Sequence, residues 1–113
     1  MLINRRKFDI RVFTLVTSVN GVLKAYFYEE GYLRTSSWEF NLKHLDRREI
    51  HLTNDAVQKN TDEYGKFEAG NKLSYLDFQK YLNINYSDLN INFKRDILSQ
   101  IRKLVTDSIR SVY

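Results

Sequence analysis

An α+β fold is predicted by two features of this 113-residue sequence. The first third alternates apolar and polar residues around an Asn20-Gly21 pair, as the strands of a β-hairpin do. The last third repeats apolar residues at helical spacing. Because the two kinds of segment follow one another instead of alternating, we expect an antiparallel hairpin or meander, then a loop region and two helices. The length predicts no more than one domain.

The first predicted strand is Arg6–Thr17, which is rich in β-branched and aromatic residues. Alternation puts its apolar side chains on one face and its charged side chains on the other. The charged face carries Lys7, Asp9 and Arg11. Asn-Gly favours a type I′ turn, so Val22–Tyr28 is predicted to return beside the first strand.

A second turn is predicted at Glu30-Gly31, followed by a short third strand at Tyr32–Thr35. Leu42–Ile50 is compatible with one helical turn. The polar stretch His51–Asn54 is predicted as a loop. The segment Asp62–Asn71 contains two glycines and many charges, so we expect a surface loop there.

Two helices are predicted in the last third. Ser74 is a candidate N-cap for the first, with Asp77 at the capping-box position. The second is expected from about Asn92 to Ser111. Its predicted apolar stripe consists of Phe93, Ile97, Ile101, Leu104, Val105 and Val112.

Composition narrows the function classes. With no cysteine, neither a disulfide framework nor a thiolate metal site can form. No apolar run is long enough to span a bilayer. The net charge of +4 favours an anionic partner, such as a phosphate group, an acidic polypeptide or a nucleic acid.

The charged strand face and Arg34 could hold anions. Lys and Arg bind phosphate oxygens, and Arg does so through a bidentate fork. Asp9 could accept hydrogen bonds from ribose hydroxyls. The alternative is an ordinary solvated strand face with cross-strand charge pairs.

The side chains of His51, Thr53 and Asn54 offer mixed hydrogen-bond donors and acceptors. The alternative is that Thr53 or Asn54 caps a helix. Neither His51 nor His44 lies in a metal-binding motif. The basic last helix could lie on a membrane surface, but Asp96 and Asp107 interrupt its basic face and favour a solvated helix packed on a sheet.

Several motifs in order resemble the tubulin-tyrosine ligase family of ATP-grasp ligases. They are Arg6–Arg11 (RKFDIR), Glu30-Gly31-x-Leu33-Arg34, His51–Asn54 (HLTN), Val57–Lys59 (VQK), Tyr64–Glu68 (YGKFE), Gly70-Asn71, Phe78, Tyr81-Leu82 and Gln100-Ile101. The resemblance covers nearly the whole chain. It implies that residues 1–113 are a central part of an ATP-grasp catalytic domain, that is, a partial ATP-grasp domain.

The resemblance implies that an amino acid is joined to a protein carboxylate through an acyl phosphate. Arg11 and Arg34 would be catalytic, and Lys7, Asp9, Thr53 and Asn54 would bind the nucleotide. Arg34, His51 and Lys59 would bind substrate. The implied cofactors are ATP and Mg²⁺, and the implied partners are a tubulin C-terminal tail and a free amino acid, acting in the cytoplasm, cytoskeleton or cilium. No membrane partner is expected, and nucleic acid is disfavoured.

Two departures from the family pattern qualify this expectation. Glutamate-adding members usually carry Tyr after HLTN, where this chain has Asp55. The family's Mg²⁺ ligands follow the last helix, and its nucleotide hinge and Gly-rich lid precede RKFDIR, so these parts are expected outside this chain. The isolated chain is therefore expected to be inactive. The alternative is a non-catalytic basic module that binds acidic tails or nucleic acid.

Overall fold

The computed structural model describes residues 1–112 and has the predicted α+β composition. The residues group into two compact units. The first comprises Met1–Arg11 and Tyr32–Ser74, and the second comprises Val12–Gly31 and the chain from Tyr75 onward. Strands β1 (Arg6–Val19) and β2 (Val22–Glu39) contribute residues to both units.

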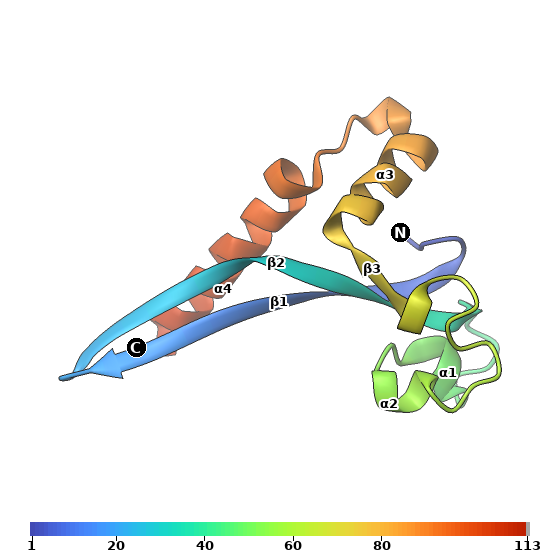
Figure 1. Ribbon diagram of the computed structural model, residues 1–113, viewed down its shortest axis with the longest axis horizontal. Helices are drawn as coiled ribbons and strands as arrows, with labels where there is room; N and C mark the ends of the chain where they lie inside the picture. The colour runs from blue at the N-terminus through green and yellow to red at the C-terminus, as the bar shows by residue number, and fades with distance from the viewer. Residues whose placement is uncertain (113) are drawn as a thin grey trace. The chain divides into compact units, whose positions relative to one another are not determined.

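The predicted hairpin turn is confirmed. Asn20 and Gly21 connect β1 to β2 (Figure 1), and both have left-handed φ angles, of 51° and 77°. A two-residue turn with positive φ at both positions matches the right-handed twist of the flanking strands. Asn and Gly are the residues that adopt this conformation most readily.

The predicted turn at Glu30-Gly31 is wrong, because β2 continues without interruption through Glu39. Gly31 is not among the glycines with left-handed φ, so nothing reverses the chain there. The predicted strand Tyr32–Thr35 is instead part of β2. It pairs antiparallel with β3 (Lys72–Ser74) through Tyr32–Arg34, in the sheet order β1-β2-β3.

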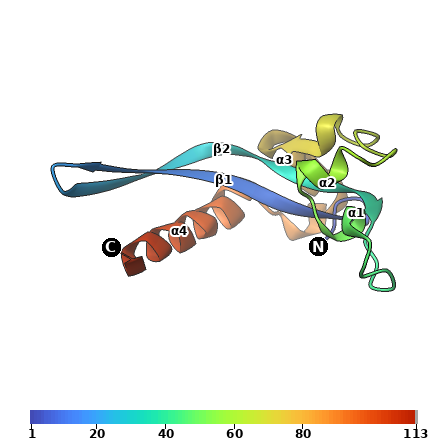
Figure 2. The ribbon, with the colours of Figure 1, turned by 90° about the horizontal axis from the view of Figure 1, so that it is seen from below.

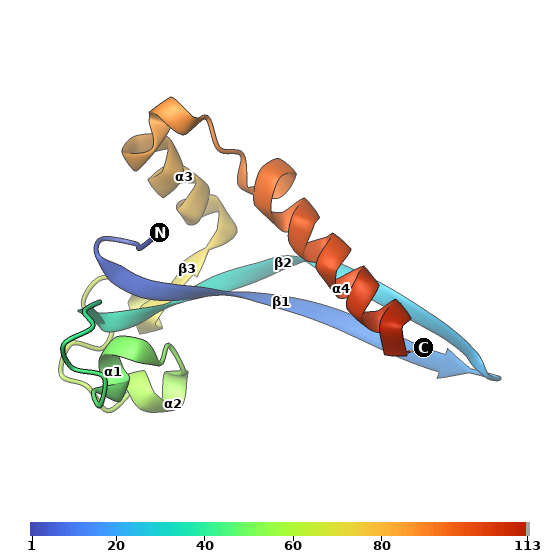
Figure 3. The ribbon, with the colours of Figure 1, turned by 180° about the vertical axis from the view of Figure 1, so that it is seen from behind.

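In the first unit, two short helices follow β1 and β2 along the chain and precede β3. They are α1 (Arg48–His51) and α2 (Asp55–Gln58), which lie side by side in Figures 1 and 3. A 3₁₀ turn at Ala69–Asn71 leads into β3. The apolar core of this unit is small and includes Ile3, Leu33 and Ile50. Polar contacts therefore carry an unusual share of the packing.

A buried ion pair lies at the centre of this polar packing. The side chain of Arg6 is 1% exposed and donates from Nη1 and Nη2 to the two carboxylate oxygens of Glu68, at 2.9 and 2.5 Å. Arg6 Nη1 also donates to the Ser36 carbonyl at 3.0 Å, and its guanidinium lies 4.1 Å from the centroid of the Phe67 ring. The Thr35 hydroxyl donates to Glu68 at 2.9 Å. This bidentate geometry fixes the 66–71 loop against β1 and β2.

Asn71 provides a second anchor for the same loop. Its side-chain amide donates to the Thr35 carbonyl at 3.1 Å and to the Ser37 hydroxyl at 2.8 Å. Its amide oxygen accepts from Gly65 N at 2.8 Å. The segment Asp62–Asn71 is thus a loop, as predicted, but its end is buried and not a free surface loop.

The second unit contains the two predicted helices, α3 (Tyr75–Asn85) and α4 (Ser99–Val112), with a π-helical turn at Phe93–Leu98 before α4. Phe93 packs on Tyr75 and Phe78 of α3, with ring centroids 4.6 and 5.6 Å apart. The side chain of Asn92 accepts from Arg95 N and so caps the turn, which supports the predicted start of the last helix. None of the helices within residues 1–112 has the length and apolar character needed to cross a bilayer.

Helix α4 lies along the distal part of the hairpin (Figure 2), as two hollows lined by both elements show. The predicted apolar stripe is only partly right. Ile97, Ile101 and Val105 are half-buried, whereas Leu104 and Val112 are exposed. The difference arises because the side chains that face the hairpin recur at four-residue steps, a row that misses positions 104 and 112.

Replacing Glu68 with Ala is expected to lower the free energy of unfolding by about 3–5 kcal/mol, because it leaves the buried Arg6 guanidinium without a counter-charge. Urea denaturation of the variant measures this loss. Glu63→Ala is the matched control, since Glu63 pairs with a well-exposed Lys66 and should contribute less than about 1 kcal/mol. Equal losses in the two variants would contradict a special role for the buried pair.

Candidate functional site

Three distant segments of the chain meet within the first unit. Strand β1 supplies Lys7 and Asp9, β2 supplies Arg34, and the residues that follow α1 supply Thr53. These are side chains from three of the motifs identified in the sequence. We call Lys7, Asp9, Arg34 and Thr53 the polar cluster.

Asp9 and Arg34 form the central contact of the polar cluster. Arg34 Nε donates to Asp9 Oδ1 at 2.9 Å, and Arg34 Nη2 donates to the other carboxylate oxygen. Neighbouring strands bring the pair together, so the cross-strand charge pairing that was the alternative to an anion-binding strand face is present. The contact restrains the guanidinium in one orientation through two parallel hydrogen bonds.

The surroundings of Asp9 favour its charged form. Burial alone would raise the pKa of Asp9, but the hydrogen bond and charge of Arg34, a hydrogen bond from Thr53 and the charge of Arg11 more than offset it. The net result is a pKa below the ordinary value for Asp. The hydrogen bond to Asp9 in turn raises the pKa of Arg34. The pair is therefore fully ionised at neutral pH.

Lys7 contacts the HLTN segment through the backbone. Its Nζ donates to the carbonyl oxygen of His51 at 2.6 Å. The imidazole of His51 is engaged elsewhere, with Nε2 2.9 Å from the His44 carbonyl and an edge-on contact to Phe40. The structure thus brings the His51 carbonyl, and not its ring, to the polar cluster.

Gln58 fixes the position of the HLTN segment. It is fully buried, and its Nε2 donates to the carbonyls of Leu52 and Glu49 at 2.5 and 3.1 Å. Its Oε1 accepts from Ser37 N on β2 at 2.9 Å. In the sequence, Gln58 stands out only as part of the VQK motif, which indicates no role for it. A polar residue at a buried helix position gives no signal until its partners are known.

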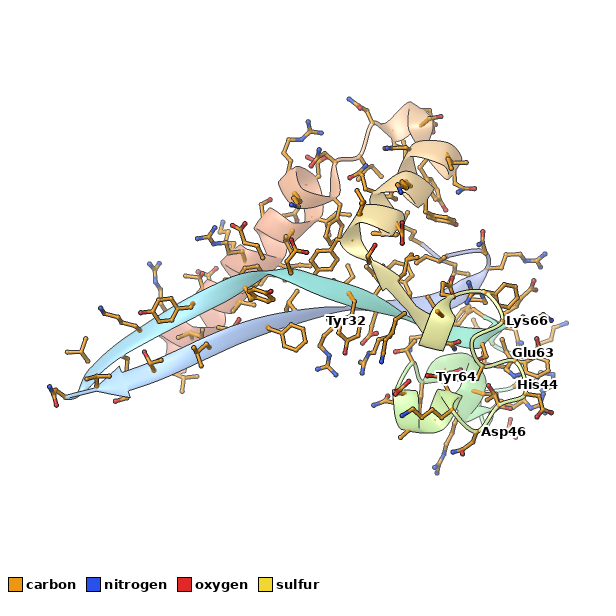
Figure 4. All side chains as sticks on the ribbon, in the orientation of Figure 1. Tyr32, His44, Asp46, Glu63, Tyr64 and Lys66 are labelled. Carbon is orange, nitrogen blue, oxygen red and sulfur yellow. The ribbon has the colours of Figure 1, made fainter. Side chains whose placement is uncertain are left out.

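Lys59 belongs to a separate small cluster with Asp55 and Tyr64. Lys59 Nζ lies 3.1 Å from Asp55 Oδ2, and the Tyr64 hydroxyl donates to Asp55 Oδ1 at 3.0 Å. Hydrogen bonds from Lys59 and Tyr64 lower the pKa of Asp55, and the charge of Lys72 adds to this effect. Tyr64 comes from the loop after α2 (Figure 4). Asp55 also contributes to the charge surroundings of Arg34, which connects the two clusters.

The remaining candidates lie at the rim of the polar cluster. Arg11 is exposed, and its charge acts on Asp9. Asn54 is exposed at the N-cap position of α2, but its side chain makes no capping hydrogen bond. The alternative reading of Thr53 or Asn54 as a side-chain cap is therefore not supported.

The polar cluster carries an excess of positive charge once Arg11 is included. Arg34 is hydrogen-bonded to Asp9, the charge of Arg11 also acts on Asp9, and Lys7 donates to the His51 carbonyl. Such an arrangement suits an anionic ligand with several oxygens. Within residues 1–112, no group of three or more His, Cys, Asp or Glu side chains is arranged to hold a metal ion.

The Arg34–Asp9 pair predicts a specific pH dependence of stability. Because the pKa of Asp9 is lower in the folded chain than in the unfolded chain, its stabilising contribution is complete above the unfolded value of about 3.9 and is lost as the pH falls through the folded pKa. We therefore expect Asp9→Asn to be less stable than the parent sequence at pH 6. The difference should vanish at low pH, as measured by urea denaturation. A difference that stays constant over this range would contradict the assignment.

Known proteins with similar sequences indicate the family of this chain. The chain matches the profile of the Tubulin-tyrosine ligase family over residues 1–113. It is 35% identical to the probable tubulin polyglutamylase TTLL9 of Bos taurus over 94% of this chain and 24% of that protein. It is 33% identical to the probable alpha-tubulin polyglutamylase Ttll1 of Tetrahymena thermophila over 99% of this chain and 27% of that protein.

Tubulin glycylases are similar as well. The chain is 40% identical to tubulin glycylase 3B of Drosophila melanogaster over 74% of this chain and 12% of that protein. It thus spans roughly a quarter or less of the length of these curated relatives. The match over the whole chain shows that it belongs to the tubulin-tyrosine ligase family, a family of ligase enzymes.

Proposed function

We propose that these 113 residues are a central part of an ATP-grasp catalytic domain in an ATP-dependent ligase that adds an amino acid to a carboxylate of a tubulin tail. The observation that carries the proposal is the convergence of three motifs on the Asp9–Arg34 contact. The printed names of the relatives, tubulin polyglutamylases and glycylases, supply the substrate class. Action at the cytoskeleton, and at cilia where tubulin is concentrated, follows from that substrate.

The residues of the polar cluster fit the anionic part of ATP. The ammonium of Lys7 is held by one carbonyl oxygen and has two further protons to donate. Arg11 and Arg34 add charge beside it, and Thr53 and Asn54 offer oxygen and nitrogen atoms for the sugar or phosphates. The Mg²⁺ ligands would come from outside these residues, since Mg²⁺ is usually bound by one or two carboxylates together with substrate phosphates, and the carboxylate of Asp9 is already paired with Arg34.

ATP would supply the phosphoryl group that converts the tail carboxylate into an acyl phosphate. The chain's own residues would act by position and charge. Arg34, oriented by Asp9, would hold the acceptor carboxylate or the acyl phosphate. Arg11 would neutralise the charge on the transferring group. The hydrogen bond to the carbonyl of His51 would keep the ammonium of Lys7 directed toward the same transferring group.

Lys59 would bind the carboxylate of the incoming amino acid. In this chain its ammonium is paired with Asp55, so the carboxylate must share or displace that contact. The pair is largely exposed, and exposed pairs contribute little energy, so this exchange costs little. Asp55 would then be free to attract the ammonium or amine end of the same amino acid.

Which amino acid is added would be tested by incubating the full-length protein with tubulin, ATP and labelled Tyr, Glu or Gly. Absence of all three products would count against the proposal.

Arg11→Ala and Arg34→Ala should each reduce ligation by the full-length protein by about two to four orders of magnitude, the loss expected for a key electrostatic group. The rate of labelled amino-acid incorporation into tubulin measures the effect. Arg47→Ala is the control, because Arg47 is an exposed arginine of the same unit that pairs with Glu49 outside the polar cluster. Loss of activity in the Arg47 variant alone would contradict the assigned roles.

Residues 1–113 alone are expected to bind Mg·ATP weakly or not at all and to show no ligation, because the polar cluster provides cations but no metal site of its own. The hairpin exposes Phe13, Leu15, Tyr26 and Tyr28, so oligomers are expected at high concentration. Calorimetric titration with Mg·ATP and light scattering test both statements. Micromolar affinity on a stable monomer would show a self-sufficient domain instead.

A further inference from the structure

A groove in the second unit runs between α4 and the distal part of the hairpin. Its first part is a hollow of about 200 Å³ lined by Phe27, Glu29, Lys94, Leu98, Ser99 and Arg102. Its second part, about 260 Å³, is lined mainly by α4 residues from Arg102 to Arg110 and by Thr14, Ala25 and Phe27 of the hairpin. Phe27 and Arg102 line both parts, so the two hollows form one continuous groove.

Three cations mark the groove along its length. Lys94, Arg102 and Arg110 are all exposed. Among residues 1–112 no ion pair engages any of the three, whereas the neighbouring Arg95 is paired with Asp96. Glu29 is the one carboxylate in the lining. The groove is therefore cationic and its charges are uncommitted.

The spacing of these cations suits an extended polypeptide. Eight residues of α-helix rise about 12 Å, so Arg102 and Arg110 of α4 are about 12 Å apart along the helix, and Lys94 precedes them in the π-helical turn. Four residues of an extended chain span about 13 Å, and residues four apart point to the same side. Two carboxylates four residues apart in an extended acidic peptide would thus meet Arg102 and Arg110, and a further carboxylate of the same peptide would meet Lys94.

We propose that this groove binds an extended, glutamate-rich polypeptide segment. The inference rests on the proposed function, since it provides a docking surface for an acidic tail at a place distinct from the polar cluster. A nucleic acid fits less well, because single strands are bound through several aromatic side chains on which successive bases stack, and among residues 1–112 Phe27 is the one aromatic residue that lines these two hollows. A membrane surface fits less well too, because the apolar row of α4 faces the hairpin and is half-buried.

Binding is measured by fluorescence anisotropy of the full-length protein with a labelled oligoglutamate peptide of about ten residues, which is long enough to span the groove. The groove variant combines Lys94→Gln, Arg102→Gln and Arg110→Gln. The control variant combines Lys24→Gln, Lys43→Gln and Lys103→Gln, which are exposed cations outside the groove lining. Both variants lose the same charge, so only the placement of that charge differs. Oligoglutamine, a single-stranded oligonucleotide and anionic vesicles serve as competing probes.

We expect the groove variant to raise the Kd for oligoglutamate about tenfold or more, and the control variant to change it by less than about twofold. The salt dependence of binding should also weaken in the groove variant. Equal weakening in both variants would overturn the proposal, because net charge alone would then explain the binding. Tighter binding of the oligonucleotide or of vesicles through the same three residues would overturn it as well.

The outcome is separable from that of the proposed function, because peptide binding requires neither ATP nor turnover. Amino-acid incorporation into tubulin without any oligoglutamate binding at the groove would reject the docking surface and leave the ligase assignment standing. Groove-dependent binding of oligoglutamate without incorporation of any amino acid would reject the ligase assignment and leave the docking surface standing.

Discussion

The buried Arg6 guanidinium imposes the constraint on which the first unit depends. A charge taken out of water must be paired, and within residues 1–112 the carboxylate that contacts it belongs to Glu68, far away in the sequence. Pairing of this guanidinium with Glu68 brings the 66–71 loop onto β1 and β2, and the Thr35 hydroxyl donates a further hydrogen bond to the same carboxylate. The fold of this unit is thus determined as much by one ion pair as by apolar burial.

The polar interior has a consequence for the candidate site. Ser37 on β2 receives hydrogen bonds from Asn71 and Thr61 and donates its backbone N–H to Gln58, which in turn holds the carbonyls that follow α1. This chain of bonds fixes the carbonyl of His51 that Lys7 contacts. Since hydrogen bonds are directional, such a network specifies positions more sharply than apolar packing would. A site that works by placing charges needs that precision.

Local patterns in the sequence predicted the elements whose cause is local. The Asn20-Gly21 turn follows from positive φ, and the start of the last helix follows from the Asn92 cap. The predicted turn at Glu30-Gly31 failed because a glycine permits a turn without requiring one, and pairing with β3 keeps the chain extended. The motifs singled out Asp9 and Arg34, which lie in contact in the structure, and their functional roles stay a prediction. The roles of Gln58 and Glu68 could not be predicted, because they depend on partners that lie far away in sequence.

Several cations of the first unit and the three cations of the α4 groove differ in how they are compensated. In the first unit, Arg6, Arg34 and Lys59 each have a carboxylate within hydrogen-bond reach, which holds their side chains in place. In the second unit, the three cations of the α4 groove are uncompensated within the described residues. Paired cations lose little entropy on meeting a ligand, so they suit a small ligand that must be positioned accurately. Unpaired cations keep their full long-range attraction, so they suit the capture of a flexible polyanion whose exact register is unimportant. Under the two proposals, the distribution of pairing, more than the net charge of +4, would distinguish the proposed site for chemistry from the proposed docking surface.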